Sequence, residues 1–447
     1  MGKSREQGEK ALHEQVENGQ SGQKRRASLL RHPVFGRTFT AYSLAVFGDW
    51  FDAIAIQVLI GYRWQASPLE IALVPVCMAV PGLLFGAAAG AAADRLDKLR
   101  LMRVCDLLTA LATVAILFVP NILWLLPLLT VRAALGVFNV PAQQALTRRV
   151  VSEEQLLDAT SLNGLVGQLS RIAGPLMGAA VLALLSPQAC IAVNAIVRLF
   201  SYVILRTVPK EAVSEQQMEG NKAVSLEQKP RTGAMLREGW AFVRRTPVLR
   251  NLMLFALLGM LAIQTIDFQF VSLFRRIAPD NETAIGWLLA SSGAAAACVA
   301  AANMRFERLR RAGWAIKLGG SYALLGLSVL VIGLLPVGAP IYALLVTGLL
   351  LGMGNGLFMI TFNHALQQET PPELTGRVFG IQSTVLGGVM IAAPPLGGLL
   401  VQRWGPGEVF AAVGLLVFVL GLIGLLFGRK LWPVLSSPKS DEQARSA

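Results

Sequence analysis

About twelve long apolar runs follow one another along this chain, and they decide what it can fold into. A helix needs about 20 mainly apolar residues to cross the hydrocarbon core of a bilayer. Hydrophobic residues make up 54% of the 447-residue chain and charged residues only 15%, whereas soluble domains carry about 25% charged residues. The pattern predicts an all-α polytopic membrane protein.

The apolar runs form two sets of six, separated by a polar stretch. We predict helices at residues 37–62, 70–92, 101–120, 122–145, 157–185 and 188–207, and then at 248–275, 282–303, 313–335, 338–366, 376–402 and 406–429. The predicted regions are a polar tail (1–36), a six-helix bundle (37–207), a linker with an amphipathic helix (208–247), a second six-helix bundle (248–429) and a second tail (430–447).

The two sets of helices resemble repeats of one another. A shift of 220 positions places Pro175 on Pro395 and Gly178 on Gly398, and Asp52 falls near Asp267. Two six-helix halves joined by a long loop are typical of transporters built from parallel repeats.

The distribution of basic residues predicts the orientation. The segments that connect helices on the outer side hold only Arg63, Arg275, Arg276 and Arg403, whereas most of the 40 lysines and arginines lie in the tails, the linker and the inner loops. Cytoplasmic loops carry such an excess. We expect both termini in the cytoplasm and the protein in the inner membrane, and the basic charge to indicate topology and contact with lipid rather than nucleic acid.

Several kinds of site are absent from the sequence. The four cysteines stand singly in apolar stretches, the three histidines form no ligand pattern, and no phosphate-binding loop or nucleophile motif occurs. We therefore expect no enzyme activity, no metal, no cofactor and no direct use of ATP.

Ionisable residues within the predicted helices are candidates for proton coupling, because a charge at that depth costs several kcal/mol unless it is paired or hydrated. Arg132 lies about 15 Å below the outer end of its helix, and Asp49 and Asp52 lie at about 16 and 21 Å from the inner end. An Asp–Arg pair is therefore plausible, either as a coupling element or as a static ion pair. Asp267 is the corresponding candidate in the second half.

Two further motifs concern helix packing and gating. Gly90, Asp94 and Arg95 belong to the loop after the second helix, and Asp94 is expected to accept hydrogen bonds from the start of the eleventh helix near Arg377. An ordinary basic loop is the alternative. The fifth helix carries small residues spaced four apart and a proline that kinks the helix. This pattern serves either close helix packing in a gate or general packing. The residues of the motif are Ser170, Arg171, Gly174, Pro175 and Gly178.

These motifs resemble those of the major facilitator superfamily over roughly residues 35–430. The stretch Gly90 to Arg100 is similar to its signature loop, Arg132 with Gly136 to its helix-4 motif, and Ser170 to Ala179 to the helix-5 antiporter motif of exporters. The run PAQQALTRRVVSEEQLLDATSLNGL resembles the macrolide-efflux-like subgroup of drug–proton antiporters. Asp97, Ser170 and Ala179 depart from the superfamily's usual glycines.

The resemblance implies the major facilitator fold and export of an amphipathic compound by alternating access, driven by protons, from a monomer in the membrane. A dedicated exporter of a siderophore or metabolite and a lysophospholipid flippase are the alternatives within transport, and a non-transporting receptor of the same fold lies outside it. The candidates for lining a substrate cavity are Phe47, Trp50, Phe51, Gln264, Phe268 and Asn355. Each aromatic side chain among them is as well suited to facing lipid as to contacting a substrate.

Overall fold

The computed structural model describes residues 29–209, 232–281, 283–307, 312–371 and 374–432. Most of the two predicted tails and the middle of the predicted linker lie outside these residues. All the elements described are helices, and ten of them are long and apolar enough to cross a membrane. The predicted all-α polytopic architecture in two six-helix halves is confirmed.

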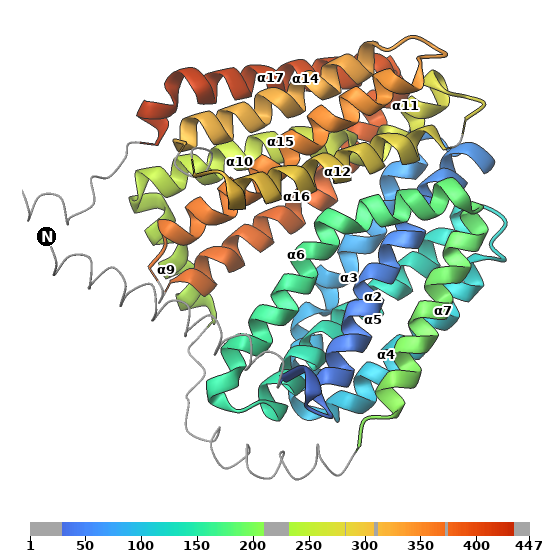
Figure 1. The fold of residues 1–447 in the computed structure, drawn as a ribbon, viewed down its shortest axis with the longest axis vertical. Helices are drawn as coiled ribbons and strands as arrows, with labels where there is room; N and C mark the ends of the chain where they lie inside the picture. The colour runs from blue at the N-terminus through green and yellow to red at the C-terminus, as the bar shows by residue number, and fades with distance from the viewer. Residues whose placement is uncertain (1–28, 210–231, 282, 308–311, 372–373, 433–447) are drawn as a thin grey trace, which may run out of the picture.

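The first half of the protein has its six long helices close to the predicted positions. They are α2 (Phe35–Val58, continued by the π-helical turn η1, Leu59–Arg63), α3 (Pro68–Arg95), α4 (Lys98–Ile116), α5 (Ile122–Val150), α6 (Glu153–Leu184) and α7 (Pro187–Arg206). Helix α4 packs between α5 and α7, and α6 packs against α2 (Figure 1).

The second half repeats this arrangement after the linker helix α9 (Thr232–Arg245). Its helices are α10 (Pro247–Ile266), which continues through the 3₁₀ turn η2 (Asp267–Gln269) into α11 (Phe270–Ile277), α12 (Ala284–Arg305), η3 (Ala315–Gly319) with α14 (Gly320–Leu334), α15 (Ile341–Gln368), α16 (Thr375–Trp404) and α17 (Pro406–Leu431). Helices α6 and α12 lie side by side between the two halves (Figure 1).

Polar side chains fix where several helices begin. Ser67 and Glu70 form a capping box at the start of α3, and the Asn121 and Ser186 side chains accept backbone N–H groups at the starts of α5 and α7. Asp97, which stands where the superfamily usually has glycine, caps α4 by accepting the Arg100 N–H at 3.0 Å. These caps satisfy backbone donors that the first turn of a helix leaves unpaired, so the departure at Asp97 has a structural role.

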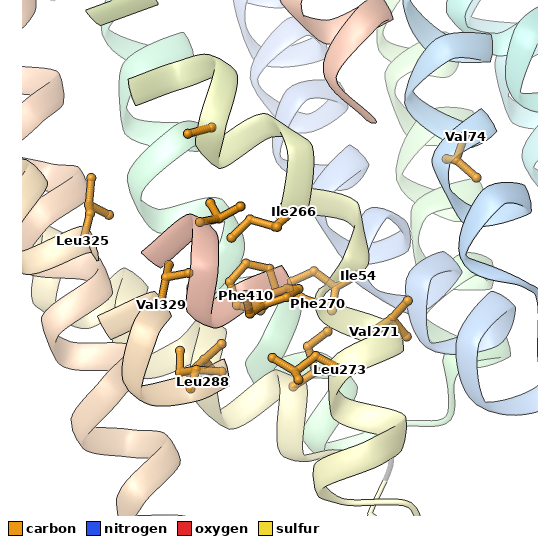
Figure 2. Close-up of a cluster of buried hydrophobic side chains, with 14 of the residues drawn as sticks. Ile54, Val74, Ile266, Phe270, Val271, Leu273, Leu288, Leu325, Val329 and Phe410 are labelled. Atoms are coloured by element: carbon orange, nitrogen blue, oxygen red, sulfur yellow. The ribbon is translucent and has the colours of Figure 1, made fainter. Parts of the chain in front are cut away.

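The two halves meet at one end of the molecule, which we call the far end. There Tyr62 Oη donates to the Ala278 carbonyl (3.2 Å), Gln269 Nε2 donates to the Pro68 carbonyl (2.8 Å), and Arg275 Nη1 donates to the Ala66 carbonyl (2.8 Å). Apolar side chains of both halves also join one buried cluster, to which α2, α3, α11, α12 and α17 contribute Ile54, Val74, Val271, Leu288 and Phe410 (Figure 2).

At the opposite end, which we call the linker end because Arg206 and Thr232 flank the linker there, the same halves stand apart. Helices α3 and α16 cross in close contact at the far end, where a methyl group on Gly398 would lie 2.8 Å from the Pro68 carbonyl oxygen. Toward the linker end a methyl group would meet nothing within 4 Å at Gly86 or Gly90 of α3, or at Gly376 or Gly380 of α16. The molecule is therefore closed at the far end and open at the linker end (Figure 1).

Candidate functional site

Three aspartates and two arginines from four helices of the first half form one connected cluster in the interior. Asp49 and Asp52 come from α2, Asp106 from α4, Arg132 from α5 and Arg198 from α7. Because charged side chains within a membrane protein are expensive to bury, such a cluster is functional by default.

Asp52 is almost fully enclosed, with 3% of its side chain exposed. Its Oδ2 accepts hydrogen bonds from Arg132 Nη1 at 2.6 Å and from Asn194 Nδ2 at 2.8 Å. Charge-assisted bonds of this length are about twice as strong as neutral ones. The predicted Asp–Arg contact between the first and fourth membrane helices is present in the structure.

Asp49 connects the two arginines. Its Oδ2 accepts a hydrogen bond from Arg198 Nη2 at 2.5 Å, and its Oδ1 lies 3.4 Å from Arg132 Nη2. Asp49 is also the accessible member of the cluster, since 44% of its side chain is exposed, whereas Arg132 and Arg198 are 12% and 11% exposed. Any exchange of protons between the cluster and water therefore passes most easily through Asp49.

Asp106 completes the cluster and is held mainly by neutral donors. It accepts hydrogen bonds from Ser201 Oγ at 2.6 Å and from Asn139 Nδ2 at 2.8 Å, while Arg198 Nη1 is 3.5 Å away. Sequence reasoning missed Asp106, Arg198, Asn194 and Ser201. The signal was available for the first two, because both are ionisable residues inside predicted membrane helices.

The charges of the cluster do not balance. With every member ionised, three carboxylates face two guanidinium groups and the sum is one negative charge. A single proton on one carboxylate makes the cluster neutral, and a low-dielectric interior favours the neutral form. The fully ionised cluster is therefore one proton away from neutrality.

Asp267, the candidate in the second half, lies apart from this cluster. It begins the 3₁₀ turn η2, its residue is exposed, and within the described chain no basic side chain pairs with it. The core of the second half contains instead a stack of aromatic rings. The Tyr322 ring lies between those of Phe255 and Phe358, and its centroid is 4.9 Å from each of theirs. The two repeats thus differ in the chemistry of their interiors.

The small residues of the helix-5 motif bring α6 against α2. A side-chain carbon on Gly174 would overlap the Trp50 ring, and one on Gly178 would overlap the Trp50 backbone carbonyl. Ser170 is buried and its hydroxyl donates to the Gly167 carbonyl at 2.9 Å. The side chains of Arg171 and Pro175 lie outside the described part of the structure. Gly174 and Gly178 therefore set the distance between α6 and the helix that carries Asp49 and Asp52.

Replacing Gly178 by Ala is expected to destabilise the protein by about 1–3 kcal/mol, because the added methyl group meets backbone that cannot rotate away. Thermal unfolding in detergent, followed by intrinsic fluorescence, measures the effect. Gly164→Ala on the same helix is the matched control, since a methyl group there meets nothing within 4 Å. Equal melting temperatures for the two variants would contradict the packing role of Gly178.

Asp94 of the signature loop and Arg377 of α16, both described residues, form no ion pair with each other. Asp94 and Arg95 are exposed at the end of α3. Arg377 Nη1 instead pairs with Glu238 Oε2 of the linker helix α9 at 2.6 Å, and Gly239 lets α9 approach the Arg377 backbone closely. The predicted contact between Asp94 and the start of the eleventh membrane helix stays a prediction.

The candidates for the substrate cavity lie on both halves. Phe47, Trp50 and Phe51 are half-buried on α2, with Trp50 against Gly174 of α6. Gln264 contacts Met390 of α16. Phe268 packs on the buried apolar cluster, and Asn355 is exposed on α15. The two cavities found at the far end among the described residues, of about 420 and 220 Å³, are lined by other residues.

Solved structures share this architecture at low sequence identity. The nucleoside transporter NupG has a TM-score of 0.66 at 12% identity and covers 89% of this chain and 99% of its own. A bacterial homologue of the human lysosomal transporter Spinster, described as inward-facing and unoccupied, has a TM-score of 0.60 at 11% identity, covering 89% and 96%.

Curated relatives match along most of the sequence. The multidrug efflux pump Tap of Mycolicibacterium fortuitum is 29% identical, with 86% of this chain and 92% of the relative covered. Macrolide efflux protein A of Streptococcus pyogenes is 23% identical, with 83% and 91% covered. A transporter of Bacillus subtilis named YfiS, with no assigned substrate, is 28% identical over 87% and 91%. The predicted resemblance to macrolide-efflux proteins is confirmed.

The family model of the Major Facilitator Superfamily matches residues 38–394 and 281–446, which together span both halves of the chain. The fold, the two six-helix repeats and the motif residues agree with that match. The chain is a membrane transporter that belongs to the Major Facilitator Superfamily.

Proposed function

We propose that this transporter exports amphipathic drugs or related small molecules from the cytoplasm in exchange for protons. The observation that carries the proposal is the buried cluster of Asp49, Asp52, Asp106, Arg132 and Arg198, whose ionised form has one negative charge in excess. A transporter that only lets its substrate equilibrate has no need of an unbalanced charge at this depth, because burying it costs free energy.

The proton is proposed to enter at Asp49, the accessible carboxylate of the cluster. Protonation of Asp49 removes the negative charge on which both arginines converge, and each arginine then pairs with one remaining carboxylate, Arg132 with Asp52 and Arg198 with Asp106. Buried polar atoms without protein partners lie beside this route: Arg198 Nε and Asn194 Oδ1. They retain hydrogen-bonding capacity for water that carries a proton.

The different packing at the two ends of the molecule supports alternating access. We expect the linker end to face the cytoplasm, because the excess of lysine and arginine lies there, and the structure would then be an inward-open state. The transport cycle then requires α3 and α16 to separate near Gly398 and to close at the cytoplasmic end, where the space beside Gly86, Gly90, Gly376 and Gly380 is open. Small residues on both helices permit the close backbone approach that such closure needs.

The substrate class is inferred from the relatives and from the side chains along the opening. Two relatives carry names that describe multidrug and macrolide efflux. Phe47, Trp50 and Phe51 are half-buried aromatic residues on the helix that also carries the charged cluster, and such residues bind the apolar parts of ligands over large areas. We expect a monomer in the inner membrane that needs no cofactor, contacts lipid, substrate and protons, and does not bind nucleic acid.

Transport into inside-out vesicles tests the proposal. An imposed pH gradient, with ethidium, a macrolide and a lysolipid assayed in parallel, is expected to drive accumulation of the drugs, and an uncoupler is expected to collapse it. Movement of the lysolipid alone would identify a flippase. Transport of none of the three, with a correctly folded protein, would favour a dedicated metabolite exporter and would contradict multidrug export.

A further inference from the structure

A cavity of about 420 Å³ lies at the far end, between the two halves. Residues of η1 and of the turn into α3 form one wall, and residues of α11 and of the turn after it, with the ends of α16 and α17, form the other. The lining residues are Tyr62, Gln65, Pro68, Ser272, Arg275, Arg276, Pro279, Val401 and Pro406. The cavity therefore exists in this form only while the two halves are in contact at the far end.

The charged residues that line the cavity are both basic. Arg275 and Arg276 form no ion pair within the described chain. The nearby carboxylate of Glu70 is engaged by Ser67, whose backbone N–H and hydroxyl donate to its Oε2 at 2.7 and 2.8 Å. Asp280 and Glu408 are also close in sequence to lining residues but do not line the cavity. Two positive charges thus face a space that no carboxylate of the lining neutralises.

The two arginines are held in place by their surroundings. Arg275 Nη1 donates to the carbonyls of Gly61 (3.2 Å) and Ala66 (2.8 Å) across the boundary between the halves. A guanidinium group has five N–H donors, so this anchoring leaves donors for a ligand. The Arg276 guanidinium lies against Gly407, where a side-chain carbon would displace it.

The other polar side chains of the lining donate mainly within the protein. The hydroxyl of Tyr62 donates to the Ala278 carbonyl (3.2 Å), that of Ser272 to Gln269 Oε1 (2.9 Å), and Gln65 Nε2 to the Tyr62 carbonyl (2.8 Å). A side-chain amide has two N–H donors, so Gln65 keeps a second one. Gln65 has a φ of 50°, in the left-handed region that residues other than glycine seldom adopt, and strained backbone of this kind tends to occur at functional sites. The donors that the lining offers are thus those of the two guanidinium groups and one amide, and the lining contains no carboxylate, which is the chemistry that recognises an oxyanion.

We propose that this cavity binds a small oxyanion, such as a phosphate or carboxylate group, and that the bound anion holds the far-end contact closed. The binding site stands on its own geometry. Only its effect on transport rests on the proposed function, in which the far end faces the outside. The anion comes either from solution or from the headgroup of an outer-leaflet lipid, and both supply the same charge and acceptors.

Thermal unfolding of the purified protein in neutral detergent tests binding. Sodium phosphate is expected to raise the melting temperature by several degrees in a saturable way, relative to sodium chloride at equal ionic strength. Arg276→Gln is expected to weaken phosphate affinity at least tenfold, and Gly407→Ala, which displaces the Arg276 side chain, to weaken it as well. Arg403→Gln is the matched control, because Arg403 lies at the same end but contacts Trp404 and does not line the cavity.

Nanodiscs distinguish the two sources of the anion. If a lipid headgroup is the ligand, discs of phosphatidylglycerol are expected to stabilise the wild-type protein more than the Arg276→Gln variant, and added phosphate is expected to have little further effect. If a free anion is the ligand, neutral discs respond to phosphate as the detergent-solubilised protein does. Should Arg276→Gln fail to fold, calorimetric titration of the wild-type protein with phosphate decides the question. Heat indistinguishable from that of chloride, or an unchanged response in Arg276→Gln, would overturn the site.

Discussion

Replacing Asp49 by Asn is expected to reduce substrate accumulation driven by a pH gradient at least tenfold, while substrate exchange without a gradient continues. The substitution leaves two arginines facing Asp52 and Asp106, so the cluster is neutral without a proton. Asn also has the shape of a protonated Asp and keeps a side-chain oxygen for Arg198 Nη2. The variant therefore resembles a permanently protonated state, which can change conformation but cannot exchange protons.

The measurement uses inside-out vesicles with an imposed pH gradient, and counterflow of labelled substrate reports exchange in the same preparation. Asp280→Asn, an exposed acidic residue at the far end, is the control for loss of a carboxylate outside the cluster. Asp267→Asn discriminates between the halves, because Asp267 has no basic partner within the described chain and we expect coupling to persist. Full accumulation by Asp49→Asn together with loss of accumulation by Asp267→Asn would place the proton site in the second half.

The positions of the membrane helices were predictable from sequence, and the differences at their ends have a common cause. The fourth helix was predicted to end at 145 but continues to Val150, and the fifth was predicted to begin at 157 but begins at Glu153. Hydropathy detects only the part of a helix that lies in hydrocarbon. Turns that extend into water carry polar residues and keep their backbone hydrogen bonds, so they are helical without being apolar.

The candidate site was only partly predictable, because burial of a charge can be inferred from one sequence whereas pairing cannot. Arg132, Asp49 and Asp52 were found because each is a charge inside an apolar run. Asp106 and Arg198 satisfy the same criterion and were not recognised. What sequence could not show is that Asp49 is shared between two arginines, since that sharing depends on the rotation and packing of α2 against its neighbours.

The signature loop illustrates a different limit. Gly90 belongs to a motif predicted to serve helix packing and gating, yet a methyl group on Gly90 would meet nothing within 4 Å. The same residues must serve every conformation of an alternating-access transporter, and one sequence motif can describe a contact made in only some of them. In this state Arg377, the arginine expected to lie near Asp94, forms an ion pair with Glu238 at 2.6 Å.

Removing Arg198 is expected to cause a large loss of stability. The change Arg198→Met leaves Arg132 to face three carboxylates, and the ionised cluster then has two negative charges in excess. Breaking a buried ion pair by removing one partner costs about 3–5 kcal/mol. Thermal unfolding in detergent at neutral pH measures the effect, and Arg403→Met on the exposed surface, expected to change stability by less than about 0.5 kcal/mol, is the control.

The double variant Arg198→Met with Asp106→Asn separates charge imbalance from loss of packing. It restores the single negative excess of the native cluster. Asn at this position keeps one oxygen for Asn139, which donates to Asp106 Oδ1 at 2.8 Å, while its amide N–H can donate to the Ser201 hydroxyl, which lies 2.6 Å from Asp106 Oδ2 and can itself donate to the Ala41 carbonyl. If charge imbalance is the cause, the double variant is expected to recover more than half of the lost stability, although Asp106→Asn alone gains little. A double variant no more stable than Arg198→Met would show that Arg198 acts through packing, and the proposed exchange of one proton would then lose its electrostatic basis.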